Sequence, residues 1–478
     1  MSVDSRLPAY SAVGEPNLAF HAERLTDRHP HPLVGLVQHG PYSRSLPHLV
    51  LDPIRIAVIA PHGMLRSAEA LIGELETRYS PRERKQYLVD FLGFSRVFGV
   101  RAVLADPSVR VELPTQLDDD FVRSPRGHQL LAERLTQALS ALQARRTEFD
   151  VVLILLADRW AAGFWGPEGE DFDLHDYLKA ITAARGIPMQ VVQEGSALQY
   201  FCRCSVMWRL SIAFYCKAGG IPWKLAEAPQ DTAFIGLSYA LRPQDNAGPR
   251  FVTCCSQVFD ADGVGLEFIA YESDDIHTER DNPFLSRAQM RRVMTRSLWL
   301  YQRRHAGRPP RRVVIHKSTE FKPEEVDGCF DAWLSAEGLD LIQVQQDTLW
   351  HGVLLNKRPG QNKGEPEAYP CVRGTYLPLG GREVLLWTQG NAPSAVGGKN
   401  YYKEGKGVPS PLLLQRFAGH GGWDDTCRAV LGLSKMNWNN DGLYDHLPVT
   451  MGYAKVLARI VKRMPHLGTM PYQVRFFM

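Results

Sequence analysis

The stretch FDVVLILLA, residues 149–157, has the length and the apolar character of a buried β-strand. It belongs to a series in which apolar strands alternate with helical patterns. The other members are IRIAVIAP (54–61), SAEALIGELETRYS (67–80), GVRAVLA (99–105) and GHQLLAERLTQALSALQARR (127–146). Alternating strands and helices predict parallel β-α-β units, so residues 55–228 are expected to form an α/β domain.

Two further regions flank this domain. Residues 1–54 are rich in proline and histidine and are expected to form an irregular or short-strand lead-in. Residues 229–478 open with two strand-like runs joined at Asp262-Gly263, which predicts a hairpin. An arginine-rich helix follows it, and strands and helices then alternate at 311–317, 324–338, 340–346 and 383–390. A hairpin followed by this alternation is the order expected of an RNase H-like fold.

Four residues between 175 and 224 predict an anion site. His175 and Lys179 lie one turn apart on one face of the helical segment HDYLKAITAAR. Gln190 lies near the start of the next short strand, and Lys217 in the last turn of the following helix. All four can donate hydrogen bonds to one terminal phosphate. Two plainer interpretations stay open: Lys217 only complements its helix dipole, and His175 with Lys179 is a solvated face.

Overall charge does not mark the chain as a nucleic-acid binder, because the formal net charge is only +3. A local bias does exist. From Arg280 to Arg312 the sequence has ten arginines and one acid, Asp281. Arginine suits phosphate because its planar fork donates two parallel hydrogen bonds. The run therefore favours a polyanion, with Arg291 and Arg292 as candidate backbone contacts.

The eight cysteines form no CxxC pair, which favours buried thiols in a reducing compartment. The start of the chain lacks an apolar core of signal-peptide length, and no apolar run approaches the ~18 residues of a membrane helix. These observations predict a cytoplasmic protein without a membrane span.

Five segments carry a family resemblance. They are FYCKAGGIPWK (214–224), RRVVIHK (311–317), VRGTY (372–376), GVPSPLLLQR (407–416) and LSKMNWNNDGLYDHLPVT (433–450). In this order they resemble the MID and PIWI domains of Argonaute proteins, well over residues 150–478 and loosely before them. The length, without a PAZ module, is similar to that of the short prokaryotic Argonautes. The resemblance identifies 55–228 as a Rossmann-like MID domain and 229–478 as an RNase H-like PIWI domain.

The resemblance also gives the anion site a role. His175, Lys179, Gln190 and Lys217 match the positions that hold the 5′-phosphate of the guide strand. The family completes this pocket with the terminal carboxylate, which here belongs to Met478. A divalent cation such as Mg²⁺ commonly bridges that carboxylate and the phosphate, since two anions repel each other. The apolar tail residues, Val474, Phe476, Phe477 and Met478, predict a docked terminus rather than a frayed one.

The positions that match the family's catalytic ligands lack acids. Leu237 follows Ile235-Gly236, Ser318 follows VVIHK, and Lys455 lies in the last helix, where Argonautes that cleave carry metal ligands. Lys455 would repel Mg²⁺ but suits a backbone phosphate. We therefore expect no catalytic residue and no guided cleavage. An active nuclease stays open as an alternative, with Glu267, Asp274 or Glu279 rebuilding a metal site.

The resemblance implies a guide-dependent recognition subunit of a prokaryotic immune system. A small RNA guide would be held by its 5′ end and tested against complementary DNA of plasmids or phage. Such chains form a heterodimer with a separately encoded protein that carries an APAZ region fused to an effector. Known effectors are sirtuin-like or TIR NAD-consuming domains and nucleases. The other alternative left open is a stand-alone nucleic-acid-binding regulator.

Overall fold

The computed structural model describes most of the chain. The described residues are 9–46, 48–228, 231–242, 250–260, 269–273, 276–279, 282–356, 359–360, 363–402, 407–439, 442–464, 467 and 472–478. The predicted turn at Asp262-Gly263, and the acids Glu267 and Asp274, lie outside these residues. Within the described part, no helix combines the length and the apolar character needed to cross a lipid bilayer.

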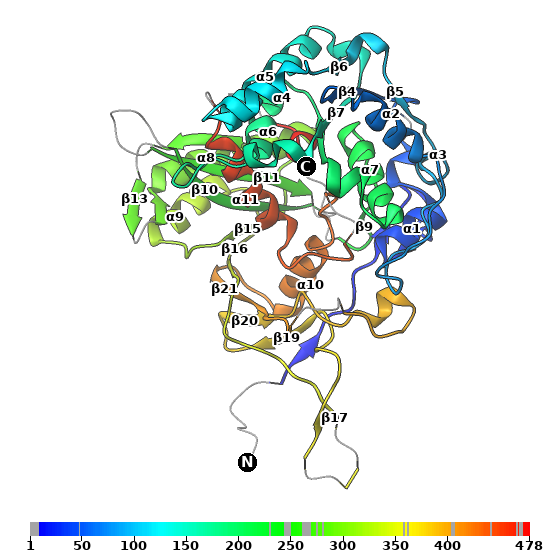
Figure 1. The fold of residues 1–478 in the computed structure, drawn as a ribbon. Helices are drawn as coiled ribbons and strands as arrows, with labels where there is room; N and C mark the ends of the chain where they lie inside the picture. Colours follow the sequence, from blue (N-terminus) through cyan, green and yellow to red (C-terminus); the bar gives the residue numbers. More distant parts are fainter. Residues whose placement is uncertain are drawn as a thin grey trace.

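The first domain is a parallel sheet with helices on both faces (Figure 1). Strand order is β5-β4-β7-β8, and β6 also pairs with β4. The strands are β4 (Ile54–Ala60), β5 (Ala102–Leu104), β6 (Arg110–Glu112), β7 (Val151–Leu156) and β8 (Met189–Gln193). The predicted β-α-β pattern is confirmed, and the apolar run at 151–156 is the central strand β7, buried along its whole length.

Successive residues of β4 and β7 pack into two different cores. Ile56 and Leu153 belong to one core, and Ile59 and Ile154 to the other. A strand buried on both faces reads as a continuous apolar run, as the sequence does here. The helices are α2 (Leu65–Glu74), α3 (Phe94–Phe98), α4 (Gln116–Arg123), α5 (Gly127–Gln143), α6 (Leu174–Ala184) and α7 (Arg203–Lys217). Helices α5 and α6 cover one face, and α7 covers the other.

The second domain is built on a nine-stranded mixed sheet of order β1-β19-β20-β21-β16-β15-β10-β11-β12. Its strands after the first domain are β10 (Thr232–Arg242), β11 (Arg250–Asp260), β12 (Ile269–Ser273), β15 (Arg312–Lys317), β16 (Gly338–Gln345), β19 (Thr375–Pro378), β20 (Glu383–Leu386) and β21 (Leu412–Ala418). Strands β10, β11 and β12 are antiparallel, and β10, β15 and β16 are parallel. This is the hairpin-first order predicted for an RNase H-like fold.

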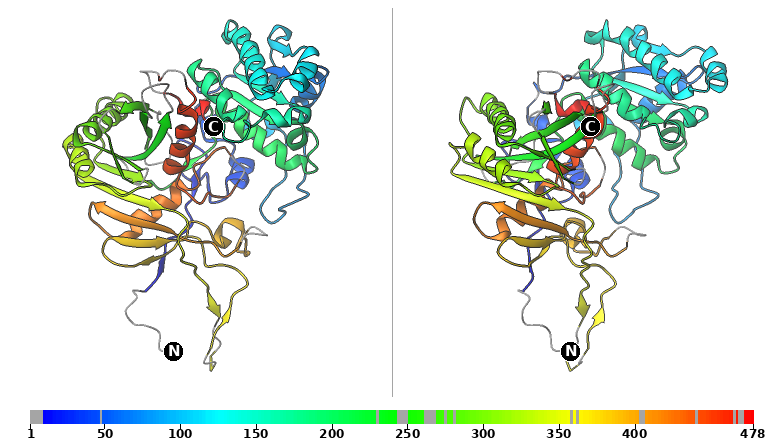
Figure 2. Two further views of the ribbon diagram at one scale, coloured as in Figure 1. Left: turned by 60° about the vertical axis from the view of Figure 1, so that its left-hand side comes forward. Right: turned by 90° about the vertical axis from the view of Figure 1, so that its left-hand side faces the viewer.

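Helices cover the two faces of this sheet separately. Helices α8 (Arg287–Arg304) and α9 (Pro323–Ala332) pack on one face, where Leu237 contacts their apolar side chains. Helices α10 (Trp423–Leu433) and α11 (Val449–Val461) lie on the other face. Figure 2 shows the red α11 and the yellow-green α8 and α9 on opposite sides of the sheet. Two short hairpins, β13 (Ile276–Glu279) with β14 (Asn282–Leu285) and β17 (Leu355–Asn356) with β18 (Glu365–Pro366), complete the strands.

The N-terminal segment is part of both domains. Its strand β1 (Ser11–Ala12) pairs with β19 at the edge of the nine-stranded sheet. Strand β2 (Leu18–Ala19) pairs with β3 (Arg28–His29) and with β9 (Lys224–Leu225), and α1 (Pro32–His39) follows. The expected irregular lead-in is therefore short-stranded and well packed, with Leu18, Phe20 and Leu33 buried.

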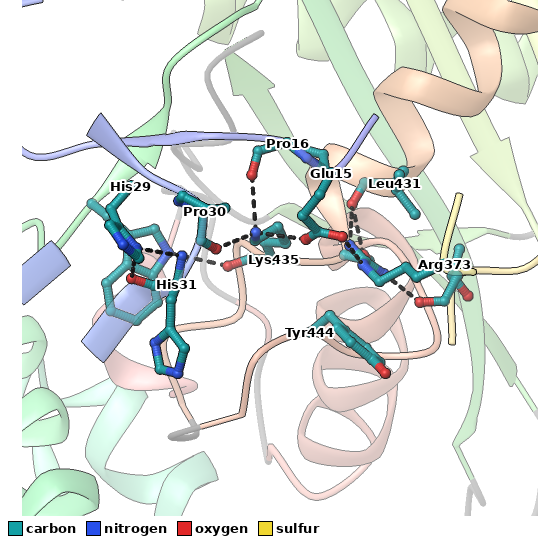
Figure 3. A network of polar contacts seen from close by, with 12 residues as sticks. Glu15, Pro16, His29, Pro30, His31, Arg373, Leu431, Lys435 and Tyr444 are labelled. Atoms are coloured by element: carbon teal, nitrogen blue, oxygen red, sulfur yellow. Dashed lines mark hydrogen bonds and ion pairs between the residues drawn. The ribbon is translucent and has the colours of Figure 1, made fainter. Parts of the chain in front are cut away.

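A buried ionic network holds this segment in place (Figure 3). The carboxylate of Glu15 accepts hydrogen bonds from Arg373 Nε at 2.9 Å and from Lys435 Nζ at 2.7 Å. Arg373 also donates to the main-chain oxygens of Thr388 and Leu431, and its guanidinium lies 4.3 Å from the centre of the Tyr444 ring. All three charged side chains are almost completely buried. Arg373 of the segment VRGTY and Lys435 of the segment LSKMNW therefore have a structural role.

Candidate functional site

The end of the chain docks between α6 and α7 (Figure 1). Lys179 Nζ donates to the main-chain oxygen of Phe477 at 3.0 Å, and Lys217 Nζ donates to that of Met478 at 2.6 Å. Phe477 and Met478 are buried, and Val474 is partly buried. The expectation of a docked apolar tail is confirmed. Both lysines hold the tail, and each ammonium keeps further donors because it has three.

Burial changes the proton affinity of both lysines. Loss of solvent lowers the pKa of Lys179 to about 8. Burial, reinforced by the charge of Lys179, lowers the pKa of Lys217 to about 7. Each lysine is therefore much easier to deprotonate than an exposed one, and the charge of this site depends on pH near neutrality.

An open pocket of about 390 Å³ lies beside the tail, where α6 begins and β7 and β8 end. His175 and Gln190 line it, as do Trp165, Gln193, Ser196 and Arg209. Ligands of parallel α/β sheets commonly bind at this carboxyl edge. Partial desolvation lowers the pKa of His175, and its contact with Asp176 opposes the shift.

The four predicted residues thus form two adjacent pairs. His175 and Gln190 line the open pocket, whereas Lys179 and Lys217 are buried against the tail. His175 and Lys179 project from consecutive turns of α6, as predicted. Gln190 Nε2 donates one of its two N–H groups to the main-chain oxygen of Val191 at 2.8 Å, which leaves its second N–H as a donor.

Sequence reasoning missed Arg209 and Trp165. Arg209 is exposed, and its guanidinium contacts Ser205 Oγ at 3.2 Å. Arg209 lies eight residues before Lys217 in α7. This helical spacing could have indicated from the sequence that the two cations lie on neighbouring parts of the helix surface. Trp165 is 64% exposed and supplies a flat apolar surface at the rim.

Three residues at the start of α6 offer ligand atoms for a metal ion. Ligand atoms of Asp173, His175 and Asp176 lie within 4.8 Å of one another. Two of these groups already have partners: Asp173 caps α6 through the backbone N–H of Asp176, and Asp176 faces Arg459 Nε of α11 at 3.3 Å. The cluster therefore also joins the two domains, as do the ion pairs of Asp171 with Lys462 and Arg463.

A second pocket, of about 290 Å³, lies where β15 and β16 end beside α11. Ser318 and Lys455 line it, together with Gln343, Gln346 and Asp347. Lys455 Nζ donates to Gln346 Oε1. Two of the three positions predicted for the PIWI centre are thus brought together, and they supply a hydroxyl and an ammonium group.

Leu237 does not face this pocket. Its side chain is fully buried among residues of α8 and α9, on the opposite face of the sheet. Side chains alternate along a strand, so the next residue faces α11, and Ser238 Oγ donates to Ala454 O at 2.8 Å. Leu237, the first position of the expected set, is therefore not brought together with Ser318 and Lys455.

The predicted backbone contacts do not share one surface. Arg291 and Arg292 are exposed on α8, whereas Lys455 lies on α11, across the sheet. The pKa of Asp331 on α9 is lowered mainly by the hydrogen bond from Arg287. The charge of Arg291 lowers it further, so Arg291 lies near this carboxylate. A nucleic acid in the second pocket would not reach these two arginines directly.

A Rossmann-like domain joined to an RNase H-like domain, with the tail docked in the first, defines the fold class. Solved structures similar to it include Argonautes. A Clostridium butyricum Argonaute bound to guide DNA and a 19-mer target DNA matches with TM-score 0.61 and 15% identity, over 96% of this chain and 53% of that one. An A. aeolicus Argonaute matches with TM-score 0.57 and 15% identity, over 97% and 54%. Another Aa-Ago structure, with externally bound siRNA, gives 0.59 and 15%, over 98% and 56%.

These likenesses establish the fold, which is that of Argonaute MID and PIWI domains. The chain spans about half the length of the Argonautes it matches. Its sequence matches no protein-family model and no curated protein sequence.

Proposed function

We propose that this chain is a guide-binding, non-cleaving Argonaute that holds a small RNA guide by its 5′-phosphate and recognises complementary DNA. The main supporting observation is the open pocket lined by His175, Gln190 and Arg209 in an Argonaute-like fold, with Lys179 near enough to His175 for its charge to help lower the pKa of His175 after burial. A terminal phosphate brings several acceptor oxygens, and the pocket provides cationic and neutral donors for them. Trp165 gives the first base a ring to stack on.

The residues at the tail fit the divalent cation expected there. If Met478 ends the chain, its carboxylate accepts a hydrogen bond from Lys217 and keeps lone pairs for a hard cation. Mg²⁺ held by Met478 and a phosphate oxygen would neutralise the repulsion between the two anions.

Affinity for the phosphorylated guide is expected to fall as pH rises. Phosphate favours protonated Lys217, and this lysine loses its proton above its pKa of about 7. The dissociation constant should rise between pH 7 and 9, by up to about tenfold per pH unit. Fluorescence anisotropy at constant ionic strength would measure it for 5′-phosphorylated and 5′-hydroxyl RNA of one sequence. A hydroxyl guide that binds equally well at pH 7 would contradict the phosphate site.

The second pocket supports recognition rather than cleavage. Two-metal hydrolysis needs several carboxylates around the scissile phosphate. Of the positions that the resemblance matches to metal ligands, Ser318 and Lys455 line this pocket, and Asp347 is the one carboxylate among the lining residues. The Lys455 ammonium suits the backbone phosphate of the paired strands.

The guide-loaded chain should therefore leave its target intact. We expect no product from a fully matched DNA or RNA target with Mg²⁺ or Mn²⁺, beyond that of a protein-free control, on a denaturing gel. Site-specific cleavage opposite the guide, abolished by Asp347→Asn, would refute this proposal. Guide-specific cleavage that survives Asp347→Asn would also refute it and would assign the metal site to other acids, such as Glu267, Asp274 or Glu279, whereas cleavage that does not depend on the guide would indicate a contaminating nuclease.

We further propose that target recognition activates a separately encoded protein with an APAZ region fused to an effector, a sirtuin-like or TIR NAD-consuming domain or a nuclease. A chain that recognises without cutting needs another subunit to carry out the response against plasmids or phage. Co-expression with the product of an adjacent APAZ gene, followed by NAD or nuclease assays with guide and target, tests it. An effector equally active without target would contradict this role.

A further inference from the structure

A cavity of about 520 Å³ lies between the second sheet and α10, and residues 14–17 of the N-terminal segment close one side of it. Its floor is made of side chains from three adjacent parallel strands, β10, β15 and β16. They are Thr232, Phe234, Arg312, Val314, His316 and Asp340. No described residue of this lining also lines the pocket of His175 or that of Ser318. The cavity is therefore a separate site, which the proposed function does not use.

Two buried polar atoms of the lining residues have no hydrogen-bond partner within the described part of the chain. They are Nε2 of His316 and Oδ1 of Asp340. The ring of His316 is completely buried, and its Nδ1 atom lies 2.8 Å from Thr450 Oγ1, which fixes the ring and leaves Nε2 over. Buried polar atoms in proteins are nearly always satisfied, so these two indicate an occupant that forms hydrogen bonds.

The charged groups that line the interior of the cavity are paired. Asp340 Oδ2 accepts a hydrogen bond from Arg312 Nε at 2.8 Å, and the carboxylate of Glu15 is held by its two buried cationic partners. Burial lowers the pKa of His316 to about 4, so this ring is neutral at pH 7. An interior of this kind suits the uncharged part of a ligand, because a buried charge without a partner is costly.

The mouth of the cavity is slightly acidic. Glu227 and Asp425 are exposed there, and Glu227 lies 3.7 Å from Arg28. Arg428 also lines the mouth, and its guanidinium pairs with Asp424 at 2.8 Å. The three acids outnumber the two arginines, so the mouth disfavours a phosphate and suits groups that donate hydrogen bonds, such as hydroxyls.

We infer that this cavity binds an uncharged purine nucleoside, with the base inside the cavity and the ribose at its mouth. The volume lies within the usual range of small-molecule sites, which combine apolar walls with a few converging polar groups. Phe234 and Val314 lie side by side in register and give the base an apolar floor. The ring centre of Phe234 is 6.1 Å from that of His316.

The hydrogen-bonding groups of a purine nucleoside match those of the lining. A purine carries both N–H donors and ring-nitrogen acceptors, so it can satisfy either tautomer of His316 as well as the Asp340 carboxylate. The ribose hydroxyls can donate to Glu227 and Asp425 at the mouth. The inference does not rest on guide binding, because the two sites have no described lining residue in common.

Isothermal titration calorimetry of the full, guide-free chain with adenosine, guanosine and their 5′-monophosphates tests the site. We expect at least one nucleoside to bind with a dissociation constant below about 1 mM, and its monophosphate to bind several-fold more weakly. Ala429→Trp fills the cavity from α10, where Ala429 is partly buried, and should abolish binding. His316→Phe keeps a ring but removes Nε2, and should weaken binding by about three- to tenfold. Ala144→Trp is the matched control, because Ala144 is exposed at the end of α5.

Nucleoside binding that Ala429→Trp abolishes and Ala144→Trp retains supports the site. No binding of either nucleoside at about 1 mM, or binding that Ala429→Trp leaves unchanged, overturns it. A monophosphate that binds more tightly than its nucleoside and is displaced by a 5′-phosphorylated guide would lie in the guide pocket, and this result overturns it too.

Hydrogen exchange of the parent chain gives a readout that does not depend on how the variants fold. Bound nucleoside should slow exchange in residues 423–433, which form α10, and should leave residues 174–184 of α6 unchanged. Slower exchange in α6 alone would assign the nucleoside to the guide pocket and overturn the inference. The proposed guide binding is measured separately, with 5′-phosphorylated RNA, and stands or falls independently.

Discussion

Replacing Lys179 and Lys217 together by methionine should abolish the preference for a 5′-phosphorylated guide. Methionine keeps most of the apolar stem, but it removes the charge and the hydrogen bonds to the main-chain oxygens of Phe477 and Met478. A hydrogen bond to a charged group contributes about 1.5–3 kcal/mol, so loss of both ammonium groups should weaken binding of the phosphorylated guide by at least about 100-fold. Binding of the 5′-hydroxyl guide should change little.

The ratio of the two dissociation constants separates a phosphate role from misfolding, since a misfolded chain loses both guides. Lys322→Met serves as the control, because Lys322 forms surface ion pairs with Glu279 and Glu320 far from the tail. A double variant that keeps the parent's phosphate preference would show that Lys179 and Lys217 only anchor the tail. Arg209 and His175 would then be the candidates for the phosphate contacts.

Glu15→Gln should strongly destabilise the chain. The substitution conserves shape but removes the one carboxylate between Arg373 and Lys435, both buried. Breaking a buried ion pair from one side costs about 3–5 kcal/mol, because a charge is left uncompensated. We expect a lower urea midpoint and faster hydrogen exchange in residues 9–19. Glu337→Gln, which removes an exposed ion pair with Arg311, should leave both unchanged.

The same network predicts sensitivity to acid. Burial raises the pKa of Glu15, but Arg373 and Lys435 outweigh it, and the net pKa is lowered. A lowered carboxyl pKa stabilises the fold above the unfolded value of 4.5 and loses that contribution as pH falls through the folded value. Glu15→Gln should therefore be less sensitive to acidification below about pH 4.5 than the parent. An equal loss of stability in both proteins would assign acid unfolding to other groups.

Much of the fold followed from local patterns. The apolar run at 149–157 became β7, and the helix of His175 and Lys179 became α6 within one residue of the predicted ends. The docked tail followed from its apolar residues. These features are decided by periodicity and hydrophobicity, which a single sequence displays directly.

The remainder depended on contacts between distant residues. Nothing near Glu15 in the sequence indicates that its partners are Arg373 and Lys435. Leu237 was grouped with Ser318 and Lys455, but its side chain lies in the core with α8 and α9, because a motif indicates a strand without fixing which side chain faces α11. Arg291 and Arg292 were grouped with Lys455 by charge, and the sheet separates them.

The Glu15 network also affects the order of events during synthesis. Glu15 leaves the ribosome 358 residues before Arg373 and 420 before Lys435. At roughly 5–20 residues per second, strand β1 waits for tens of seconds before β19 exists to pair with it. The first domain can fold in that interval, while the N-terminal segment stays an unpaired strand with a lone carboxylate. Completion of the second sheet is therefore a late step, and chaperones that bind nascent strands have a defined target in residues 9–19.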